Sequence, residues 1–268
     1  MDCAPADQPS VPAPGSKPAG SERSWYRHGV QPLLVLWDVD YTLADTDGVG
    51  RRLYQIALDE LYGLEMPKVI RSMAGRTDSS IALEVLAAAG VADPASEIAR
   101  FQRVLAARSP ELDGLVRERG KALPGATEVL AILAGPMYAG SVVQSLLTGN
   151  IPALARVKLG GLGLTEHLDL SVGAYGDVSE IRGDLVPVAQ RRAAERYGAD
   201  FAGRATVLVG DTPSDVEAAA INGARCVAVA TGSFTADQLT GAGADIVLAD
   251  LTDTARVVSA ILNGSAGS

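Results

Sequence analysis

The first residues that could do chemistry together are an acidic pair. Asp38 and Asp40 directly follow the apolar run Leu33–Trp37. In an extended chain, residues two apart point to the same side, so both carboxyl groups would face one site. Two such acids suit a metal and phosphate site, one as the nucleophile and the other as the acid and base. An exposed turn after a strand would also give this pair, so alone it is weak evidence.

A second acidic pair, Asp211 and Asp215, follows a second apolar run at residues 206–209. Gly210 allows a close approach of the backbone, and Pro213 favours the first turn of a helix. Helix capping alone would also account for these two acids. Two apolar runs that each end in acids instead indicate a shared cation site. Carboxylate oxygens are ligands that Mg²⁺ commonly takes, together with waters and phosphate oxygens.

Two further segments contain groups that would hold an anion. Thr148, Gly149 and Asn150 precede a helix-like segment. A hydroxyl, exposed backbone amides and the dipole of a helix N-terminus together form a general anion site. A plain helix cap is the simpler alternative. Arg182 is a candidate cation for a transferring phosphoryl group, although a lone arginine is more often a solvated surface charge.

The elements that must position these residues alternate between apolar runs and helical patterns. Apolar runs occur at 33–37, 141–147, 206–209, 226–230 and 245–248, with helix-like segments between them. This alternation predicts a doubly wound, Rossmann-like α/β core with a parallel sheet. Ligands of such sheets bind at the carboxyl ends of the strands. The two acidic pairs should therefore meet at that edge.

One long segment breaks the alternation. Its periodicity predicts helices at 51–62, 79–89, 97–107 and 111–119, with no strand among them. An all-helical insert after the first strand would lie above the carboxyl edge of the sheet and act as a cap. The expected organisation is a disordered Pro- and Ala-rich tail at 1–29, a catalytic core at 30–49 and 122–268, and a helical cap at 50–121.

Composition and charge limit the expected partners. The 268 residues are 47% apolar and 21% charged, as in globular proteins of one large or two modest domains. A net charge of −9 and the lack of a dense Lys and Arg run predict no nucleic-acid partner. No long apolar window or secretory leader is present, so we expect no membrane partner and a cytoplasmic location. Two Cys argue against a disulfide framework, and two His exclude a His-rich zinc site. The oligomeric state stays open.

Taken in chain order, the motifs resemble the haloacid dehalogenase-like (HAD) hydrolase superfamily. The first motif reads DVDYTL at 38–43, the second LLTGN at 146–150, and the fourth GDTPSD at 210–215. The resemblance spans nearly all of residues 33–262. Members similar to phosphoglycolate phosphatase, which carry a helical cap, are the nearest look-alikes.

The resemblance implies a Mg²⁺-dependent phosphomonoester hydrolase that acts on a small phosphorylated metabolite through an aspartyl-phosphate. Asp38 would attack phosphorus, and Asp40 would protonate the leaving alkoxide and then activate water. Thr148 and the amides around Gly149 and Asn150 would hold phosphate oxygens. The implied Mg²⁺ ligands are the Asp38 carboxylate, the Asp40 backbone carbonyl and Asp211, with Asp215 binding directly or through water.

Two parts of the resemblance are less direct. The third motif usually supplies a lysine, but none lies between Lys158 and the fourth motif, so Arg182 is the candidate. Arginine keeps the positive charge and can hold two oxygens. Arg191 and Arg192 compete for this role, although they fall inside a predicted helix where a solvated face is expected.

The expected cap also contains a candidate substrate loop. The sequence Gly-Arg-Thr-Asp at 75–78 resembles the substrate-facing loop of such caps. Arg76 and Thr77 are therefore candidate substrate contacts. The alternative is that Arg76 pairs with an acid of the cap itself.

Other activities of the same scaffold stay open to different degrees. A phosphosugar mutase shares the motifs and differs in its cap, and a catalytically retired binding module would keep the scaffold alone. A dehalogenase would leave Asp40 and Asp211 idle. A phosphonate hydrolase would need a Schiff-base lysine in the cap, for which Lys68 is the candidate near a loop. The sequence does not name the substrate.

Overall fold

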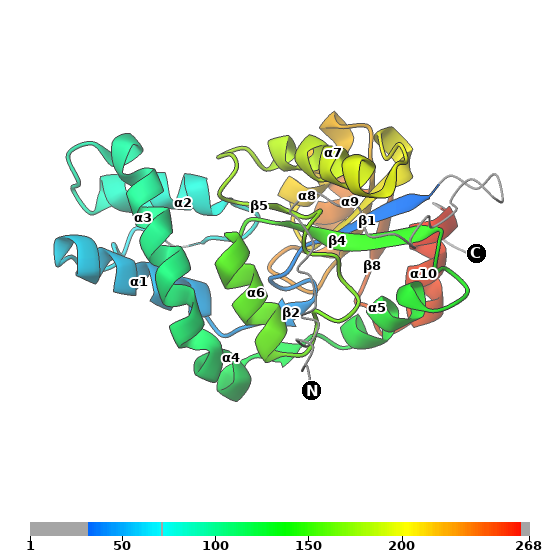
Figure 1. Cartoon of the computed structure of the whole chain (residues 1–268), viewed down its shortest axis with the longest axis horizontal. Helices are drawn as coiled ribbons and strands as arrows, with labels where there is room; N and C mark the ends of the chain where they lie inside the picture. Colours follow the sequence, from blue (N-terminus) through cyan, green and yellow to red (C-terminus); the bar gives the residue numbers. More distant parts are fainter. Residues whose placement is uncertain (1–31, 71, 264–268) are drawn as a thin grey trace, which may run out of the picture.

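A six-stranded parallel sheet forms the centre of the molecule, seen in a computed structural model that describes residues 32–70 and 72–263 (Figure 1). The strand order is β5-β4-β1-β6-β7-β8. The predicted tail at residues 1–29 lies outside the described residues. The strands are β1 (Leu33–Trp37), β4 (Val142–Thr148), β5 (Ala174–Tyr175), β6 (Thr206–Gly210), β7 (Arg225–Val229) and β8 (Ile246–Leu248).

The central strands are largely apolar because both faces of the sheet are covered. In β1, Val35 and Trp37 belong to the apolar cluster on one face. Leu34 and Leu36 belong to the cluster on the other face. This two-sided burial explains why the sequence shows continuous apolar runs rather than alternation.

Helices pack on both faces of the sheet (Figure 1). None of the helices within 32–70 and 72–263 combines the length and apolarity needed to cross a bilayer. The arrangement confirms the predicted doubly wound α/β class. One face carries α5 (Ala126–Ala134), α6 (Pro152–Gly161) and α10 (Thr254–Asn263), and the other α7 (Leu185–Tyr197), α8 (Pro213–Ile221) and α9 (Ala236–Gly241).

The chain changes direction in the middle of the sheet. From β1 it builds outward through β4 to β5, and it then crosses to the other side of β1 to form β6. The register places Trp37 beside Leu146 of β4 and beside Val209 of β6. The three strands therefore end side by side at the switch point, which is where open α/β sheets bind ligands.

Four helices and a 3₁₀ turn form a separate layer, drawn to the left of the sheet in Figure 1. They lie between β2 (Ala44–Asp45) and β3 (Lys121–Ala122), which pair as a short antiparallel ribbon. We propose this ribbon as the boundary of the cap. The helices are α1 (Val49–Tyr62), α2 (Asp78–Ala88), α3 (Pro94–Arg108) and α4 (Asp113–Arg119), and the 3₁₀ turn is Ser109–Leu112.

The cap has an apolar cluster of its own that extends onto the core. Tyr54 of α1 packs against Phe101 of α3, with ring centroids 5.5 Å apart. Ile151 and Leu154, at the start of the core helix α6, belong to the same cluster. Helix α6 is therefore the core element against which the cap packs, and its buried positions contact both parts.

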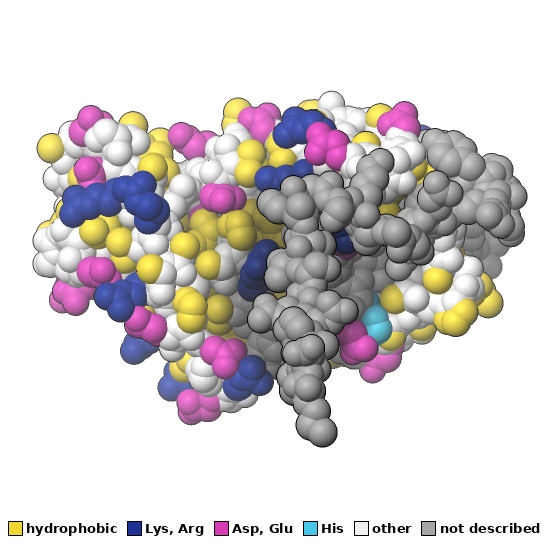
Figure 2. Space-filling model, viewed as in Figure 1, with side chains coloured by type: hydrophobic (Ala, Val, Ile, Leu, Met, Phe, Trp, Pro, Cys, Tyr) yellow, Lys and Arg dark blue, Asp and Glu magenta, His cyan; other side chains and the backbone are white. Residues whose placement is uncertain are grey.

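The outer surface carries cations and acids in alternation. Figure 2 shows Lys and Arg side chains interspersed with Asp and Glu on the visible face of the cap. Exposed ion pairs such as Arg108–Glu60 and Arg117–Asp113, each at 2.7 Å, are examples. Such pairs contribute little to stability because solvent screens them. The buried ion pairs of Arg182 with Asp38 and Asp215 lie instead in the core, at the carboxyl edge of the sheet.

Candidate active site

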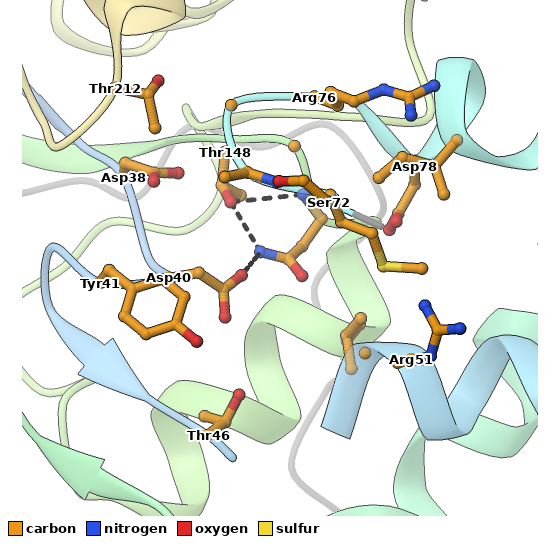
Figure 3. A pocket seen from close by; sticks show the side chains of 18 of the residues that line it. Asp38, Asp40, Tyr41, Thr46, Arg51, Ser72, Arg76, Asp78, Thr148 and Thr212 are labelled. Atoms are coloured by element: carbon orange, nitrogen blue, oxygen red, sulfur yellow. Dashed lines mark hydrogen bonds between the residues drawn. The ribbon is translucent and has the colours of Figure 1, made fainter. Parts of the chain in front are cut away.

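A cavity of about 330 Å³ lies between the carboxyl edge of the sheet and the cap. Asp38, Asp40 and Thr148 line it on the core side, and Arg51 and Asp78 line it on the cap side (Figure 3). The cap thus covers the edge where the acidic residues emerge, as the position of the insert predicts.

Three carboxyl groups converge at the base of this cavity. Asp38, Asp211 and Asp215 each offer an oxygen within 4.8 Å of the others. They meet because β1 and β6 are neighbours in the sheet. Burial, reinforced by the neighbouring acids, raises the pKa of Asp38 to about 6 and that of Asp211 to about 8. Such a cluster needs positive charge to stay ionised.

Arg182 supplies one of these charges. It lies in the 3₁₀ turn Arg182–Asp184 before α7 and is 7% exposed. Its Nη2 lies 2.8 Å from Asp38 Oδ1 and 2.7 Å from Asp215 Oδ1, and it also donates to Leu147 O. Burial lowers the pKa of Arg182, but the two carboxylates outweigh this effect and raise it above its ordinary value. The candidate for the third motif is therefore in contact with the candidate nucleophile.

The competing arginines lie elsewhere. Arg191 and Arg192 are on α7, and neither lines the cavity. Arg192 donates a hydrogen bond to the backbone carbonyl of Gly173, and Arg191 is exposed. Their positions leave Arg182 as the arginine that contacts Asp38.

The oxygens at this site fit a divalent cation. Asp211 Oδ2 is buried and has no hydrogen-bond partner in the described part of the chain. Gly232 leaves the space beside it, because a Cβ there would lie 1.8 Å from that oxygen. Asp215 is more fully engaged, since its Oδ2 accepts hydrogen bonds from the Thr212 amide and hydroxyl. Asp38 and Asp211 are thus the residues that would bind Mg²⁺ directly, and Asp215 would fit a water-mediated role. These assignments stay predictions.

The second motif lies at the end of β4 beside these acids. Thr148 is fully buried, and its Oγ1 accepts a hydrogen bond of 2.8 Å from Asn150 Nδ2. Gly149 must be glycine because a Cβ would lie 1.9 Å from Arg76 O. The loop has the predicted position, but the Asn150 side chain turns to Asp40, whose Oδ2 accepts a bond of 2.8 Å (Figure 3). Its assignment to phosphate binding stays a prediction.

The structure adds a cation that the sequence did not assign to the site. Lys158 of α6 is 3% exposed, and its Nζ lies 2.7 Å from both carboxylate oxygens of Asp40. The sequence did contain a signal that Lys158 is buried, because it shares a helix face with the apolar residues Leu154 and Ala155. A lysine on the apolar face of a helix is rarely buried unless it is paired.

The two candidate substrate contacts of the cap loop both bond within the cap, although Arg76 also lines the cavity. The guanidinium of Arg76 pairs with Glu84 and donates to Ser80 O. Thr77 is fully buried and caps α2 by accepting a hydrogen bond from the Ser80 amide. The pairing of Arg76 with a cap acid, stated above as the alternative, is thus present. Substrate contact by either side chain stays a prediction that these bonds do not support.

The same loop instead fastens the cap to the second motif. The Asp78 amide donates to Gly149 O at 2.7 Å, and Asp78 Oδ2 accepts from the Ile151 amide at 2.7 Å. Tyr54 donates its hydroxyl to Asp78 Oδ1 at 2.8 Å. Burial raises the pKa of Asp78 to about 6. In the sequence, Asp78 is an acid in the first turn of a helix, and this position gives no hint of the link between cap and core.

Arg51 is a cap cation that faces the cavity (Figure 3). It lies in the first turn of α1, and its Nη1 donates to Ile70 O at 2.7 Å. Among the residues that the structure describes, no carboxylate pairs with it. Its charge is therefore available to a ligand in the cavity, unlike that of Arg76.

Comparisons with known proteins support the resemblance inferred from the motifs. A curated relative, the probable phosphatase IndB of Dickeya dadantii, is 29% identical over 239 residues, which are 85% of this chain and 94% of that protein. A family model described as HAD-hydrolase-like matches residues 181–254, which contain Arg182, Asp211 and Asp215. Both matches are to haloacid dehalogenase-like hydrolases or phosphatases, and they are consistent with that superfamily. The resemblance inferred from the motifs is thus supported for the superfamily.

Solved structures share the haloacid dehalogenase-like fold with this chain. A hydrolase from Pseudomonas syringae has a TM-score of 0.60 at 24% identity, over 85% of this chain and 98% of that one. A haloacid dehalogenase-like family protein from Streptococcus pneumoniae has a TM-score of 0.56 at 16% identity, over 85% of this chain and 97% of that one. The narrower likeness to phosphoglycolate phosphatases stays a prediction.

Proposed function

We propose that this haloacid dehalogenase-like hydrolase is a Mg²⁺-dependent phosphomonoesterase that acts on a small phosphorylated metabolite through an aspartyl-phosphate on Asp38. The main support is the convergence of Asp38, Asp211 and Arg182 beneath one cavity. An anionic nucleophile can approach a phosphate only if cations offset the repulsion. The buried arginine supplies one such cation, and the unpartnered Asp211 Oδ2 offers a ligand for a second.

The proposed reaction has two steps. In the first, an Asp38 oxygen bonds to phosphorus, the bond from phosphorus to the leaving oxygen breaks, and Asp40 gives that oxygen a proton. In the second, Asp40 takes a proton from a water whose oxygen bonds to phosphorus, and Asp38 leaves as a carboxylate. Arg182 holds Asp38 by its 2.8 Å contact. Mg²⁺ on Asp38, Asp211 and the Asp40 carbonyl, with Asp215 through water, would supply charge neutralisation.

Purified protein with Mg²⁺ is expected to release inorganic phosphate from small phosphomonoesters, and EDTA is expected to stop this release. The reason is that the acidic cluster would repel the phosphate once the divalent charge is removed. Colorimetric phosphate release over a panel of sugar phosphates, phosphoglycolate and nucleotides, with and without added Mg²⁺, measures both effects.

Three outcomes of this assay would count against parts of the proposal. Full activity after dialysis against EDTA would contradict the requirement for Mg²⁺. No phosphate from any substrate would contradict the phosphatase reaction. Conversion of a sugar phosphate to its isomer without net phosphate release would indicate the mutase instead.

The cap side of the cavity favours a substrate with a second negative charge, because Arg51 lies there without a carboxylate partner in the described chain. Arg51→Ala is expected to raise KM about 10–100-fold for such substrates, the range of a lost charged hydrogen bond. Substrates without a second charge should keep their KM. The matched control is Arg52→Ala, whose exposed side chain does not line the cavity. Equal KM changes for both substrate types would contradict the role of Arg51.

A further inference from the structure

We propose that Lys158 is a positioning residue for Asp40, which it holds together with Asn150 in the orientation needed to activate water. This inference rests on the proposed phosphatase reaction, in which Asp40 handles the proton. It assigns a task to the buried lysine that the motifs leave unexplained, and it links the second motif to the acid and base.

The hydrogen bonds around Lys158 form a closed set. Its three ammonium protons reach Asp40 Oδ1 and Oδ2 at 2.7 Å each and Asn150 Oδ1 at 2.8 Å. The two amide protons of Asn150 reach Asp40 Oδ2 and Thr148 Oγ1 at 2.8 Å each. A lysine has three donors and an asparagine side chain two, so every donor of both residues is used. Both oxygens of Asp40 are thereby fixed.

The position of Lys158 makes this contact set part of the cavity rather than of the surface. Asp40 and Lys158 both line the cavity, and the two residues are 118 positions apart in the chain. A Cβ on Gly50 would lie 3.8 Å from the ammonium, so the first turn of α1 covers it. Burial of a charged pair costs free energy that a well-packed apolar residue would avoid. Retaining the ammonium there is therefore better explained by its orientation of Asp40 than by packing.

The two buried cations contact different acids of the site. Arg182 contacts Asp38 and Asp215, whereas Lys158 contacts Asp40. The nucleophile and the proton carrier are thus held by separate partners. Because all donors of Lys158 are already used, it has none left for a substrate phosphate, and its loss should affect turnover rather than binding.

The test compares two leaving groups in Lys158→Ala. With p-nitrophenyl phosphate and Mg²⁺, we expect kcat to fall about 10²-fold, within the range for general acid and base catalysis. KM should fall with it and leave kcat/KM near the wild-type value, because only the hydrolysis of the aspartyl-phosphate is slowed. Nitrophenolate leaves without protonation, so Asp38 should still be phosphorylated. Rapid-quench measurement should then show a stoichiometric burst of nitrophenolate followed by slow turnover. Glycerol phosphate, whose alkoxide needs a proton, should give no burst.

Rescue and double mutation separate positioning from structural damage. Ethylammonium should restore turnover of Lys158→Ala in a saturable way, and tetramethylammonium, which has no N–H donor, should not. Asp40→Asn should show the same burst, and adding Lys158→Ala to it should cost little more, since both changes disable one unit. Arg156→Ala removes an exposed cation from the same helix and should leave kcat unchanged.

The outcomes are distinguishable. An unchanged kcat, a raised KM with unchanged kcat, or a loss of turnover without a burst and without rescue would each overturn the role of Lys158. If Lys158→Ala does not fold in a thermal melt, Lys158→Met keeps the apolar stem and gives the same burst comparison. A wild-type protein that releases no phosphate would instead refute the proposed function itself.

Discussion

Asp38→Asn is expected to lower kcat by about 10⁴-fold or more, the scale on which removal of a covalent nucleophile reduces turnover. The amide has nearly the same shape as the carboxylate, but it cannot form the mixed anhydride with phosphorus. Acid-quenched wild-type protein should carry a phosphoryl group on the peptide that contains residue 38, detected by mass spectrometry, and the variant should not. Phosphate release from a small phosphomonoester measures the rate.

Loss of stability is not the expected cause of this effect. Burial raises the pKa of Asp38 to about 6, so the ionised carboxylate costs folding free energy at neutral pH. Its removal should therefore not lower the melting temperature of metal-free protein. Asp47→Asn is a matched control, because Asp47 is exposed and has a φ of 47°, which asparagine tolerates. Near-normal turnover in Asp38→Asn, or phosphate on another residue, would refute the mechanism.

Asp211→Asn is expected to lower kcat/KM about 10²–10⁴-fold and to abolish the response to Mg²⁺. The variant keeps the shape of the side chain but loses the anionic oxygen that is unpartnered in the described part of the chain. A divalent cation contributes several kcal/mol of charge stabilisation at such sites, which corresponds to this range. Titration of Mg²⁺ against activity and against melting temperature measures both effects.

The same variant should change how stability depends on pH. Burial, together with Asp38 and Asp215, raises the pKa of Asp211 from 3.8 to about 8. Protonated Asp211 therefore contributes to folding stability fully at a pH below its ordinary pKa. This contribution is lost as the pH rises through about 8. Metal-free wild type should lose melting temperature between about pH 5 and pH 9, and Asp211→Asn should lose less. Added Mg²⁺ should stabilise the wild type most at the alkaline end. If the melting temperatures of the wild type and of Asp211→Asn fall equally with pH in EDTA, the raised pKa of Asp211 is contradicted.

Local patterns were sufficient for the core and for the acids. The run Leu33–Trp37 is also the observed strand, and the helix expected at 51–62 is observed at Val49–Tyr62. Burial of both faces of a strand or of one face of a helix leaves a periodic trace in the sequence itself. Once the strands are known, the edge at which Asp38 and Asp211 emerge follows from parallel pairing.

Short elements left no such trace. The ribbon of Ala44–Asp45 with Lys121–Ala122 and the strand Ala174–Tyr175 have two residues each, which is too few to show a period. They form because distant segments are brought together, and β5 adds to the edge of a sheet that already exists.

The sequence by itself determined which acids end the strands, which loop could bind an anion, and that a helical insert would cover them. Only the tertiary structure decided which cation meets which acid. Arg182 contacts Asp38, Lys158 contacts Asp40, and Arg76 turns instead to Glu84. Charge pairing depends on distances between side chains that are far apart in the chain. For the two core pairs, the strand order and the packing of α6 and of the turn before α7 on the sheet set those distances, and no local pattern records them.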